Sequence, residues 1–253
     1  MQNDMFDLTG KIALVTGSSR GLGSGIASAL AGAGAQVVLH GSRNVPEAII
    51  ERISMTGPRP KALTGDISKA SICESLIAEV MAQYGTIDIL INNAGTIRRA
   101  PAAEHSEEDW DTVIATNLSS VFHMTKAAGR HMLARGSGKV INIASLLTFQ
   151  GGVTVPSYAA AKGGVGQLTK AFANEWASKG VNVNAIAPGY METDNTAALR
   201  ADEQRSRQIL ERIPAGRWGT SADIGGAAVF LASRASDYVH GHVLVVDGGW
   251  LAR

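Results

Sequence analysis

A tyrosine and a lysine stand four residues apart in the segment YAAAK, Tyr158 to Lys162. The segment is patterned as a helix, so both side chains lie on one helical face. A phenol has a pKa near 10 and exchanges protons poorly at neutral pH, but a nearby ammonium group stabilises the phenolate and lowers that pKa. Ser145 ends a β-rich run, where its hydroxyl is suited to hold a carbonyl oxygen while Tyr158 moves a proton. The three residues predict acid–base chemistry on a hydroxyl or carbonyl group. The alternative is an ordinary pair of helical side chains.

A glycine-rich turn, TGSSRGLG, lies between a β-rich run and a helical pattern near the start of the chain. Backbone N–H groups at a helix N-terminus bind phosphate, and glycine lets the backbone approach a pyrophosphate closely. The spacing is GxxxGxG rather than GxGxxG, so the strand–turn–helix setting carries most of the argument. We therefore predict a dinucleotide site, the alternative being a tight structural turn. The residues expected to contact the dinucleotide are Thr16, Gly17, Ser19, Arg20, Gly21, Leu22 and Gly23.

The end of the second β-rich run bears on which nicotinamide dinucleotide binds. NAD sites usually place Asp or Glu about 20 residues beyond the glycines, where it binds the ribose 2′-hydroxyl. This chain has the sequence HGSR there, from His40 to Arg43. The guanidinium groups of Arg43 and Arg20, with the Ser42 hydroxyl, suit a 2′-phosphate. The sequence therefore favours NADP, and NAD is the alternative if Arg43 faces solvent.

The elements that must position these residues alternate along the whole chain. Seven β-rich runs are expected to be strands: residues 11–15, 36–40, 61–64, 87–91, 140–143, 181–187 and 243–246. Amphipathic helical patterns separate them, among them one long helix that carries Val113 to Thr125. Such βα units favour right-handed crossovers and a parallel sheet covered by helices on both faces. We therefore predict a doubly wound α/β fold with its ligands at the carboxyl ends of the strands.

Length and composition favour one domain. The chain has 253 residues, of which 45% are hydrophobic, and we find no low-complexity linker. We expect a single domain over residues 1–253, with a charged helical insert at about 189–222 that follows the carboxyl end of a strand. We predict that the insert is a substrate lid; the alternative is a solvated pair of surface helices.

Charge, cysteine and targeting patterns argue against several kinds of partner, site and location. A net charge of +1 argues against a nucleic-acid partner, and the single Cys73 excludes an intrachain disulfide and a cysteine zinc site. We expect no metal, and we expect structural or exposed places for the six histidines, which show no ligand spacing: His40, His105, His123, His131, His240 and His242. The chain begins without the apolar run of a signal peptide, and no stretch approaches the roughly 18 apolar residues of a membrane span. A cytoplasmic protein with no membrane partner is expected.

Five features are spread along the chain: TGSSRGLG, the NNAG at residues 92–95, Ser145, YAAAK and the VDGG at residues 246–249. In combination they resemble the motifs of the short-chain dehydrogenase/reductase family, and the resemblance covers essentially the whole chain. The resemblance implies a Rossmann-like, seven-stranded parallel sheet and a homotetramer. It implies that Tyr158 is the general acid/base, that Lys162 lowers the pKa of Tyr158 and binds the nicotinamide ribose, and that Ser145 positions the substrate oxygen. It also implies that Asn117 supports a proton-relay water and that Asp66 contacts adenine. The further cofactor contacts that it implies are Ile67, Asn93, Ala94, Gly95, Pro188, Gly189, Met191 and Thr193, besides Tyr158 and Lys162.

Longer segments carry a narrower resemblance, among them NNAGTIRR, ASLLTFQGG and NAIAPGYMETDNTAALRADEQRS. They resemble family members that interconvert a hydroxyl and a keto group on a deoxy sugar acid. These members chiefly use NAD. A sugar acid needs a cation for its carboxylate, and a bidentate arginine suits it. Of the adjacent Arg98 and Arg99 we expect Arg98 to bind the substrate, the alternative being a surface pair. Gln150 and Asn195 are expected to meet sugar hydroxyls. The alternative functions are a 3-oxoacyl-thioester reductase of the same family and a non-catalytic cofactor-binding regulator.

Overall fold

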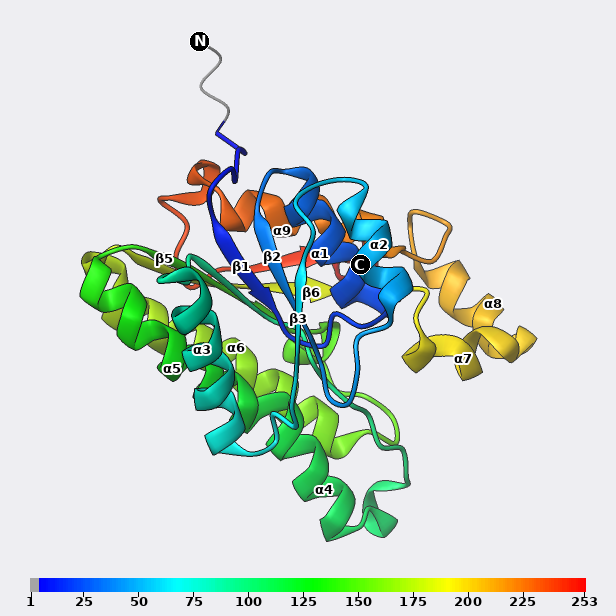
Figure 1. Cartoon of the computed structure of the whole chain (residues 1–253). Coiled ribbons are helices and arrows are strands. Elements are labelled where there is room, and N and C mark those ends of the chain that lie inside the picture. Colours follow the sequence, from blue (N-terminus) through cyan, green and yellow to red (C-terminus); the bar gives the residue numbers. More distant parts are fainter. Residues whose placement is uncertain (1–4) are drawn as a thin grey trace.

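The strands form one parallel sheet in the computed structural model, which describes residues 5–253 apart from the side chain of Asn195. They are β1 (Ile12–Val15), β2 (Gln36–Gly41), β3 (Lys61–Thr64), β4 (Ile89–Asn92), β5 (Gly138–Ile143), β6 (Val181–Pro188) and β7 (Val243–Val246). Within the described residues the sheet has seven strands in the order β3-β2-β1-β4-β5-β6-β7, and every neighbouring pair is parallel (Figure 1). The prediction of a doubly wound, seven-stranded parallel sheet is confirmed.

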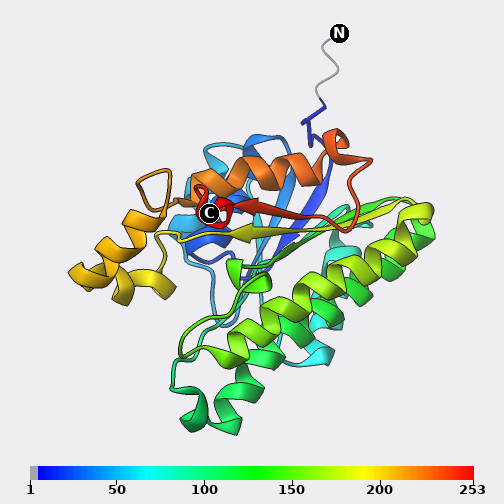
Figure 2. The ribbon, with the colours of Figure 1, turned by 180° about the vertical axis from the view of Figure 1, so that it is seen from behind.

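Helices cover both faces of this sheet. They are α1 (Gly21–Gly32), α2 (Glu47–Ser54), α3 (Ala70–Tyr84), α4 (Glu107–Ile114), α5 (Ser120–Arg135), α6 (Pro156–Trp176), α7 (Ala197–Ala201), α8 (Glu203–Arg212) and α9 (Ser221–Ala232). On one face, buried side chains such as Ile26 of α1 and Leu231 of α9 pack against the sheet. On the other, Leu76 of α3, Met124 of α5 and Trp176 of α6 do so. The two groups of helices lie on opposite sides of the strands in Figures 1 and 2.

The sheet places its carboxyl ends around one crevice. Strands β1 (IALV) and β4 (ILIN) are buried along their whole length, as expected for a parallel sheet covered on both faces. Chain order reverses at β1, with β2 and β3 on one side of it and β4 to β7 on the other. In such sheets, ligands bind outside the strand ends at this reversal. The glycine turn after β1 and the NNAG segment after β4 therefore lie side by side.

The prediction of one long helix around residues 113–125 is only partly right. α4 continues into α5 through a π-helical turn, Ala115–Ser119. The buried Asn117 lies in this wider turn, where its Oδ1 accepts a hydrogen bond from Thr96 N and its Nδ2 donates one to Thr96 O, each at 2.8 Å. π-turns occur often at functional sites. Apolar spacing did not reveal this one, because the residues on either side keep a helical pattern.

Several strand boundaries differ by one or two residues from those expected, and the start of β4 has a clear physical reason. β4 begins at Ile89 rather than at residue 87. The Asp88 carboxylate accepts a hydrogen bond from Ile12 N at 2.9 Å and pairs with Arg135 at 3.3 Å, so this position ties the strand's start to its neighbours. α6 begins at Pro156, which suits the first helical position because its missing N–H would have no partner there.

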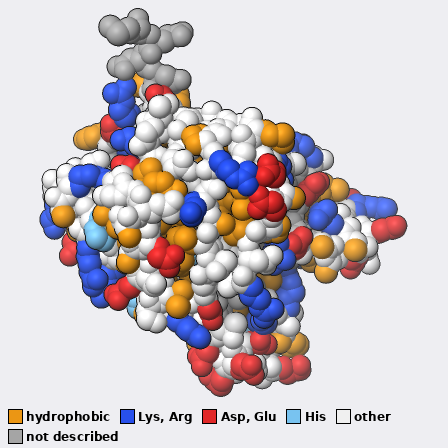
Figure 3. All heavy atoms as spheres, viewed as in Figure 1, with side chains coloured by type: hydrophobic (Ala, Val, Ile, Leu, Met, Phe, Trp, Pro, Cys, Tyr) orange, Lys and Arg blue, Asp and Glu red, His pale blue; other side chains and the backbone are white. Residues whose placement is uncertain are grey.

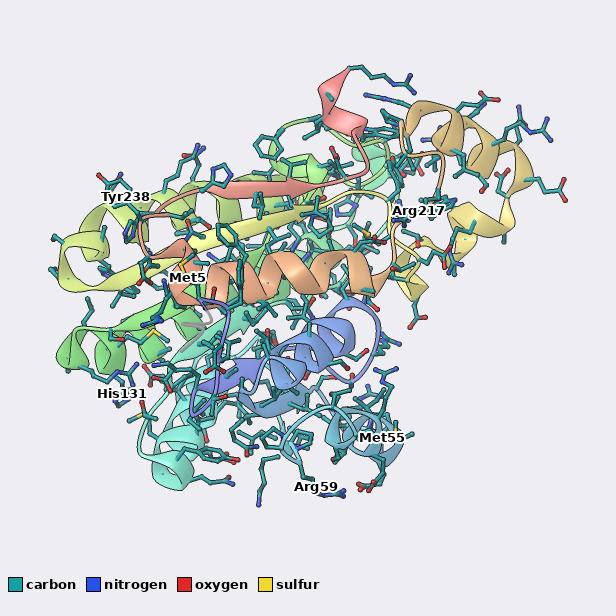
Figure 4. All side chains as sticks on the ribbon, turned by 90° about the horizontal axis from the view of Figure 1, so that it is seen from above. Met5, Met55, Arg59, His131, Arg217 and Tyr238 are labelled. Atoms are coloured by element: carbon teal, nitrogen blue, oxygen red, sulfur yellow. The ribbon has the colours of Figure 1, made fainter. Side chains whose placement is uncertain are left out.

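The insert carries α7 and α8 beyond the carboxyl end of β6. Ile209 of α8 joins an apolar cluster with Trp218 and Trp250. Arg217 then donates two hydrogen bonds, of 2.8 and 2.7 Å, to Asp223 at the start of α9. Figure 4 labels Arg217 at this junction. The far end of the insert is thus anchored to the body of the protein.

Charged side chains of both signs are interspersed over the face drawn in Figure 3. Acidic side chains gather at the tip where α4 begins, and its first turn carries Glu107, Glu108 and Asp109. Negative charge there is favourable, because a helix N-terminus has partial positive charge. Among residues 5–253, none of the helices has the length and apolar character needed to cross a membrane.

Candidate active site

A cavity of about 520 Å³ opens at the crevice outside the strand ends. It runs from the glycine turn to the catalytic candidates of α6. The residues on its wall that the sequence predicted are Gly17, Ser19, Arg20, Gly21, Leu22, Gly23, Ser42, Asp66, Ile67, Asn93, Ala94, Gly95, Arg98, Ser145, Tyr158, Lys162, Pro188, Gly189, Met191 and Thr193. Four other predicted residues, Thr16, Arg43, Asn117 and Gln150, are not among the wall residues. One cavity therefore brings most of the cofactor, substrate and catalytic candidates together.

The glycine turn interlocks with the NNAG segment. Asn93 Nδ2 donates to the carbonyl oxygens of Thr16 and Gly17, at 2.9 and 3.0 Å. Thr16 Oγ1 accepts hydrogen bonds from the N–H groups of Asn93 and Ala94, at 3.0 and 3.1 Å. A Cβ on Gly23 would lie 2.3 Å from Gly17 O and 2.4 Å from Asn93 Nδ2. Gly23 is therefore needed for a close approach, and Thr16 acts behind the cavity wall.

The end of the cavity where adenosine is predicted to bind contains a fixed carboxylate. Asp66 accepts hydrogen bonds from the hydroxyl and the N–H of Ser68, at 2.8 and 3.1 Å. These bonds lower the pKa of Asp66, so it is ionised at neutral pH. Ser42 lies on the wall nearby, whereas Arg43 is exposed and lies off it. A contact between Arg43 and a 2′-phosphate stays a prediction.

Arg20 forms an ion pair across the mouth of the cavity. Its Nη1 lies 3.2 Å from Asp194 Oδ2, and the two side chains are 76% and 71% exposed. Ion pairs this exposed contribute little to stability. Arg20 can therefore exchange Asp194 for a phosphate at small cost.

Ser145, Tyr158 and Lys162 meet at the carboxyl end of β5. Ser145 Oγ accepts a hydrogen bond from Leu147 N at 3.2 Å, which orients its hydroxyl. Lys162 Nζ donates to Ile143 O at 2.6 Å and lies 5.6 Å from the centre of the Tyr158 ring. α6 thus presents both of its predicted side chains to the strand end that carries Ser145.

Burial dominates the protonation of the pair on α6. It raises the pKa of Tyr158, while a hydrogen bond with Ser145 and the charge of Arg99 act in the opposite direction. Burial also lowers the pKa of Lys162 to about 8. The pKa of Tyr158 is raised on balance, because burial penalises the phenolate more than Ser145 and Arg99 stabilise it. A lowering of the Tyr158 pKa by Lys162 stays a prediction.

The predicted substrate residues differ in how the structure uses them. Arg98 lies on the cavity wall, where its Nε pairs with Asp109 Oδ1 at 3.1 Å and its Nη1 donates to Thr96 Oγ1 at 3.0 Å. Gln150 lies off the wall and accepts a hydrogen bond from Trp250 Nε1 at 3.4 Å. The side chain of Asn195 lies outside the described part of the chain. Arg98 is thus held in place by Asp109, and contact with a substrate stays a prediction.

Sequence reasoning missed several residues of the cavity wall. They are His40, Thr96, Thr112, Thr116, Ile143, Ala144, Asp194 and Thr196. A signal existed for His40, which is a polar residue that follows the apolar run VVL in the strand QVVLHG. Thr112 and Thr116 are separated by one helical turn, a spacing that only the structure connects with the cavity. Within residues 5–253, no group of three or more His, Cys, Asp or Glu side chains is arranged to hold a metal ion.

Proteins similar to this chain include dehydrogenases that act on sugar acids. A family model described as enoyl-(acyl carrier protein) reductase matches residues 17–251. The chain is 56% identical to the 2-dehydro-3-deoxy-D-gluconate 5-dehydrogenase of Escherichia coli, over 98% of each chain. It is 55% identical to that of Bacillus subtilis, over 99% of this chain and 98% of the relative.

A solved structure from Agrobacterium tumefaciens, described as a 2-deoxy-D-gluconate 3-dehydrogenase with bound NADP, is 56% identical to this chain. It superposes with a TM-score of 0.93 over 99% of this chain and 100% of the other. The match therefore extends over the fold, the glycine turn and the segment with Tyr158 and Lys162. The chain belongs to the short-chain dehydrogenase/reductase family.

Proposed function

We propose that this chain is an NADP(H)-dependent oxidoreductase that interconverts a hydroxyl and a keto group on a deoxy sugar acid of the 2-dehydro-3-deoxy-D-gluconate type. The observation that carries the proposal is the single cavity that joins the glycine turn to Ser145, Tyr158 and Lys162. The names of the relatives with 55–56% identity support the sugar acid, and the NADP in the Agrobacterium structure supports the cofactor.

The residues present fit a dinucleotide. A Cβ at Gly17 would lie 2.7 Å from the Ala94 backbone, and one at Gly23 would lie 2.3 Å from Gly17 O, so both glycines are needed for the turn that leads into α1 to pack closely. Its N–H groups are suited to the pyrophosphate, with Asp66 at the adenine end and Lys162 at the nicotinamide ribose. When bound, the cofactor would accept or supply a hydride at its nicotinamide ring.

The chain's own residues handle the proton and the substrate oxygen. In oxidation, Tyr158 Oη takes the proton of the substrate hydroxyl; in reduction, it returns a proton to the oxygen of the carbonyl. Ser145 holds that oxygen by a hydrogen bond and also contacts Tyr158. The carbonyl group of Lys162 accepts a hydrogen bond from Thr148 Oγ1 at 2.9 Å, which ties α6 to the loop that carries Ser145.

We also propose that residues 189–222 act as a lid and that the protein is a cytoplasmic homotetramer. Met191, Thr193 and Asp194 of the insert lie on the cavity wall, which supports the lid. An apolar groove lined by Leu118, Phe122, Leu168 and neighbours runs between α5 and α6, and Phe122 is 39% exposed. That groove supports a contact between subunits.

Cofactor choice is tested by removing the arginines one at a time. In Arg20→Ala and Arg43→Ala, we expect NADPH affinity to fall by about 10-fold or more, since each arginine is proposed to make a charge-assisted hydrogen bond to the 2′-phosphate. NADH affinity should hardly change, because NADH has no such phosphate. Titration by nicotinamide fluorescence measures both. Equal binding of NADPH by the variants and the unsubstituted protein would mean that neither arginine holds the 2′-phosphate. Tighter binding of NADH than of NADPH by the unsubstituted protein would return the assignment to NAD.

Recognition of the sugar acid is tested with Arg98→Leu. We expect the KM for 2-dehydro-3-deoxy-D-gluconate to rise by about 10-fold or more, because the substrate carboxylate loses a charged hydrogen bond, while NADPH affinity is retained. The rate is followed by nicotinamide absorbance.

Arg99→Leu is the matched control for Arg98→Leu. Because Arg99 lowers the pKa of Tyr158 by its charge, its removal should move the pH profile to higher pH rather than raise the KM. A larger KM effect in Arg99→Leu would reverse the choice between the two arginines. Turnover of a 3-oxoacyl thioester without turnover of the sugar acid would replace the proposed substrate.

A further inference from the structure

His40 is a buried polar residue whose ring joins two loops of the cavity. It is 1% exposed and lies near the end of β2. Its Nδ1 lies 3.2 Å from Gly17 N in the glycine turn, and its Nε2 lies 3.0 Å from Gly65 O in the turn after β3. Gly65 immediately precedes Asp66. One imidazole thus spans from the pyrophosphate side of the cavity to its adenine side.

The two partners determine which nitrogen carries the proton. Gly17 N–H can only donate, so Nδ1 must accept; Gly65 O can only accept, so Nε2 must carry the hydrogen. Only the neutral ring with a proton on Nε2 satisfies both. The backbone of His40 adds to this link, since its carbonyl oxygen accepts from Ser18 N at 2.9 Å and its N–H donates to Ser18 Oγ at 2.9 Å. The glycine turn is therefore tied to β2 at both Gly17 and Ser18.

We propose that His40 is a positioning residue for the dinucleotide, which holds the glycine turn and the Gly65–Asp66 turn at the separation that one bound cofactor requires. The inference rests on the proposed function, because it presupposes a dinucleotide in this cavity. β1 and β3 both pair with β2 but not with each other, so their turns meet only across β2. A side chain at the end of β2 is the direct means of coupling them.

The same geometry makes cofactor binding sensitive to acid. A second proton on the ring would place an N–H at Nδ1 against the N–H of Gly17, and the two donors would repel. Burial lowers the pKa of His40 below the ordinary value of about 6.5, which keeps the ring neutral above that pH. Affinity is then complete above about pH 6.5 and falls at lower pH as the ring is protonated.

Other charged groups lie on the elements around this ring: Arg20 in the glycine turn, Arg43 after β2, Lys61 at the start of β3 and Asp66 in the turn after β3. Side chains of these three types ordinarily titrate outside the range from about pH 5 to 8. NADH is the probe of choice, because the 2′-phosphate of NADPH titrates near about pH 6 by itself. Lys162 has a pKa of about 8 and is already protonated well below that value, so a loss of NADH affinity below about pH 6.5 reports on a histidine.

The test compares three substitutions at one position. His40→Leu removes both hydrogen bonds of the ring, and we expect the Kd for NADH to rise by about 10-fold, with a larger effect on the cofactor KM than on kcat. His40→Asn places an amide oxygen where Nδ1 accepts from Gly17 and cannot be protonated, so it should recover most of the affinity and lose the acid dependence. His40→Gln places an amide N–H near Nε2 and keeps the Gly65 bond alone, so it should give an intermediate Kd.

His131→Asn, at an exposed histidine of α5 labelled in Figure 4, is the matched control and should bind NADH as the unsubstituted protein does at every pH. Thermal denaturation and circular dichroism identify any variant that fails to fold. If His40→Leu fails to fold, His40→Asn keeps the test decisive. Unchanged NADH affinity in a folded His40→Leu, or a His40→Asn no better than His40→Leu, would overturn the role of His40 alone. Failure of the unsubstituted protein to bind either dinucleotide would instead overturn the proposed function.

Discussion

Tyr158→Phe is expected to lower kcat about 10²- to 10⁴-fold, the usual contribution of a positioned general acid or base. The substitution removes one hydroxyl and keeps the ring beside Lys162, so α6 and the cavity wall should be preserved. NADPH affinity should therefore be nearly unchanged. Steady-state turnover of the sugar acid, with a parallel fluorescence titration of NADPH, separates the two effects.

Tyr238→Phe is the matched control for this loss, because Tyr238 is fully exposed, and Figure 4 shows it far from the insert. It should turn over the substrate at the rate of the unsubstituted protein. If Tyr158→Phe retained full turnover, the assignment of Tyr158 as acid/base would be wrong. A non-catalytic regulator would show cofactor binding and no turnover in any of these proteins.

The same tyrosine determines the pH dependence. Burial raises its pKa, so the phenolate is scarce at neutral pH. Oxidation needs the phenolate, and kcat/KM for the alcohol should rise with increasing pH; reduction needs the phenol and should be favoured at lower pH. Lys162, with a pKa of about 8, loses its proton at lower pH than the phenol of Tyr158 does. The residual rate of Tyr158→Phe should not show the part of this pH dependence that arises from ionisation of the tyrosine.

Gly23→Ala is expected to cost about 1–3 kcal/mol of stability, as overpacked sites do, and to abolish tight dinucleotide binding. The added Cβ would lie 2.3 Å from Gly17 O and 2.4 Å from Asn93 Nδ2, and Gly17 O is backbone that cannot rotate away. The glycine turn and the NNAG segment must then separate, which moves the N–H groups proposed to hold the pyrophosphate. Denaturant unfolding and NADPH titration measure the two losses.

Gly32→Ala tests the same chemical change at the other end of α1. A Cβ there meets nothing within 4 Å, and the position is exposed. Stability should stay the same or rise by about 0.4–1 kcal/mol, because alanine restricts the unfolded chain. NADPH binding should not change. Equal behaviour of the two variants would mean that the close approach at Gly23 has no role.

Much of the fold followed from local pattern. The runs at residues 61–64 and 243–246 became β3 and β7 without change. The second is a short apolar run (VLVV), which stands out between amphipathic helices in a parallel sheet. The π-turn at Asn117 was not predictable, because one extra residue in a helical turn leaves the apolar spacing on either side intact. The π-turn brings Asn117 into hydrogen-bond contact with Thr96, which is distant in sequence.

The sequence by itself determined the chemistry of the site: a phenol and an ammonium group one helical turn apart, a serine at a strand end and a glycine turn that opens a helix. These are local features, since neighbours along the chain determine which face a side chain occupies. Only the tertiary structure decided the contacts between distant segments. It paired Arg98 with Asp109, and it raised the pKa of Tyr158 by burial. It also placed His40 between Gly17 and Gly65. Burial and partners depend on which strands become neighbours in the sheet, and one chain order can be folded into many strand orders.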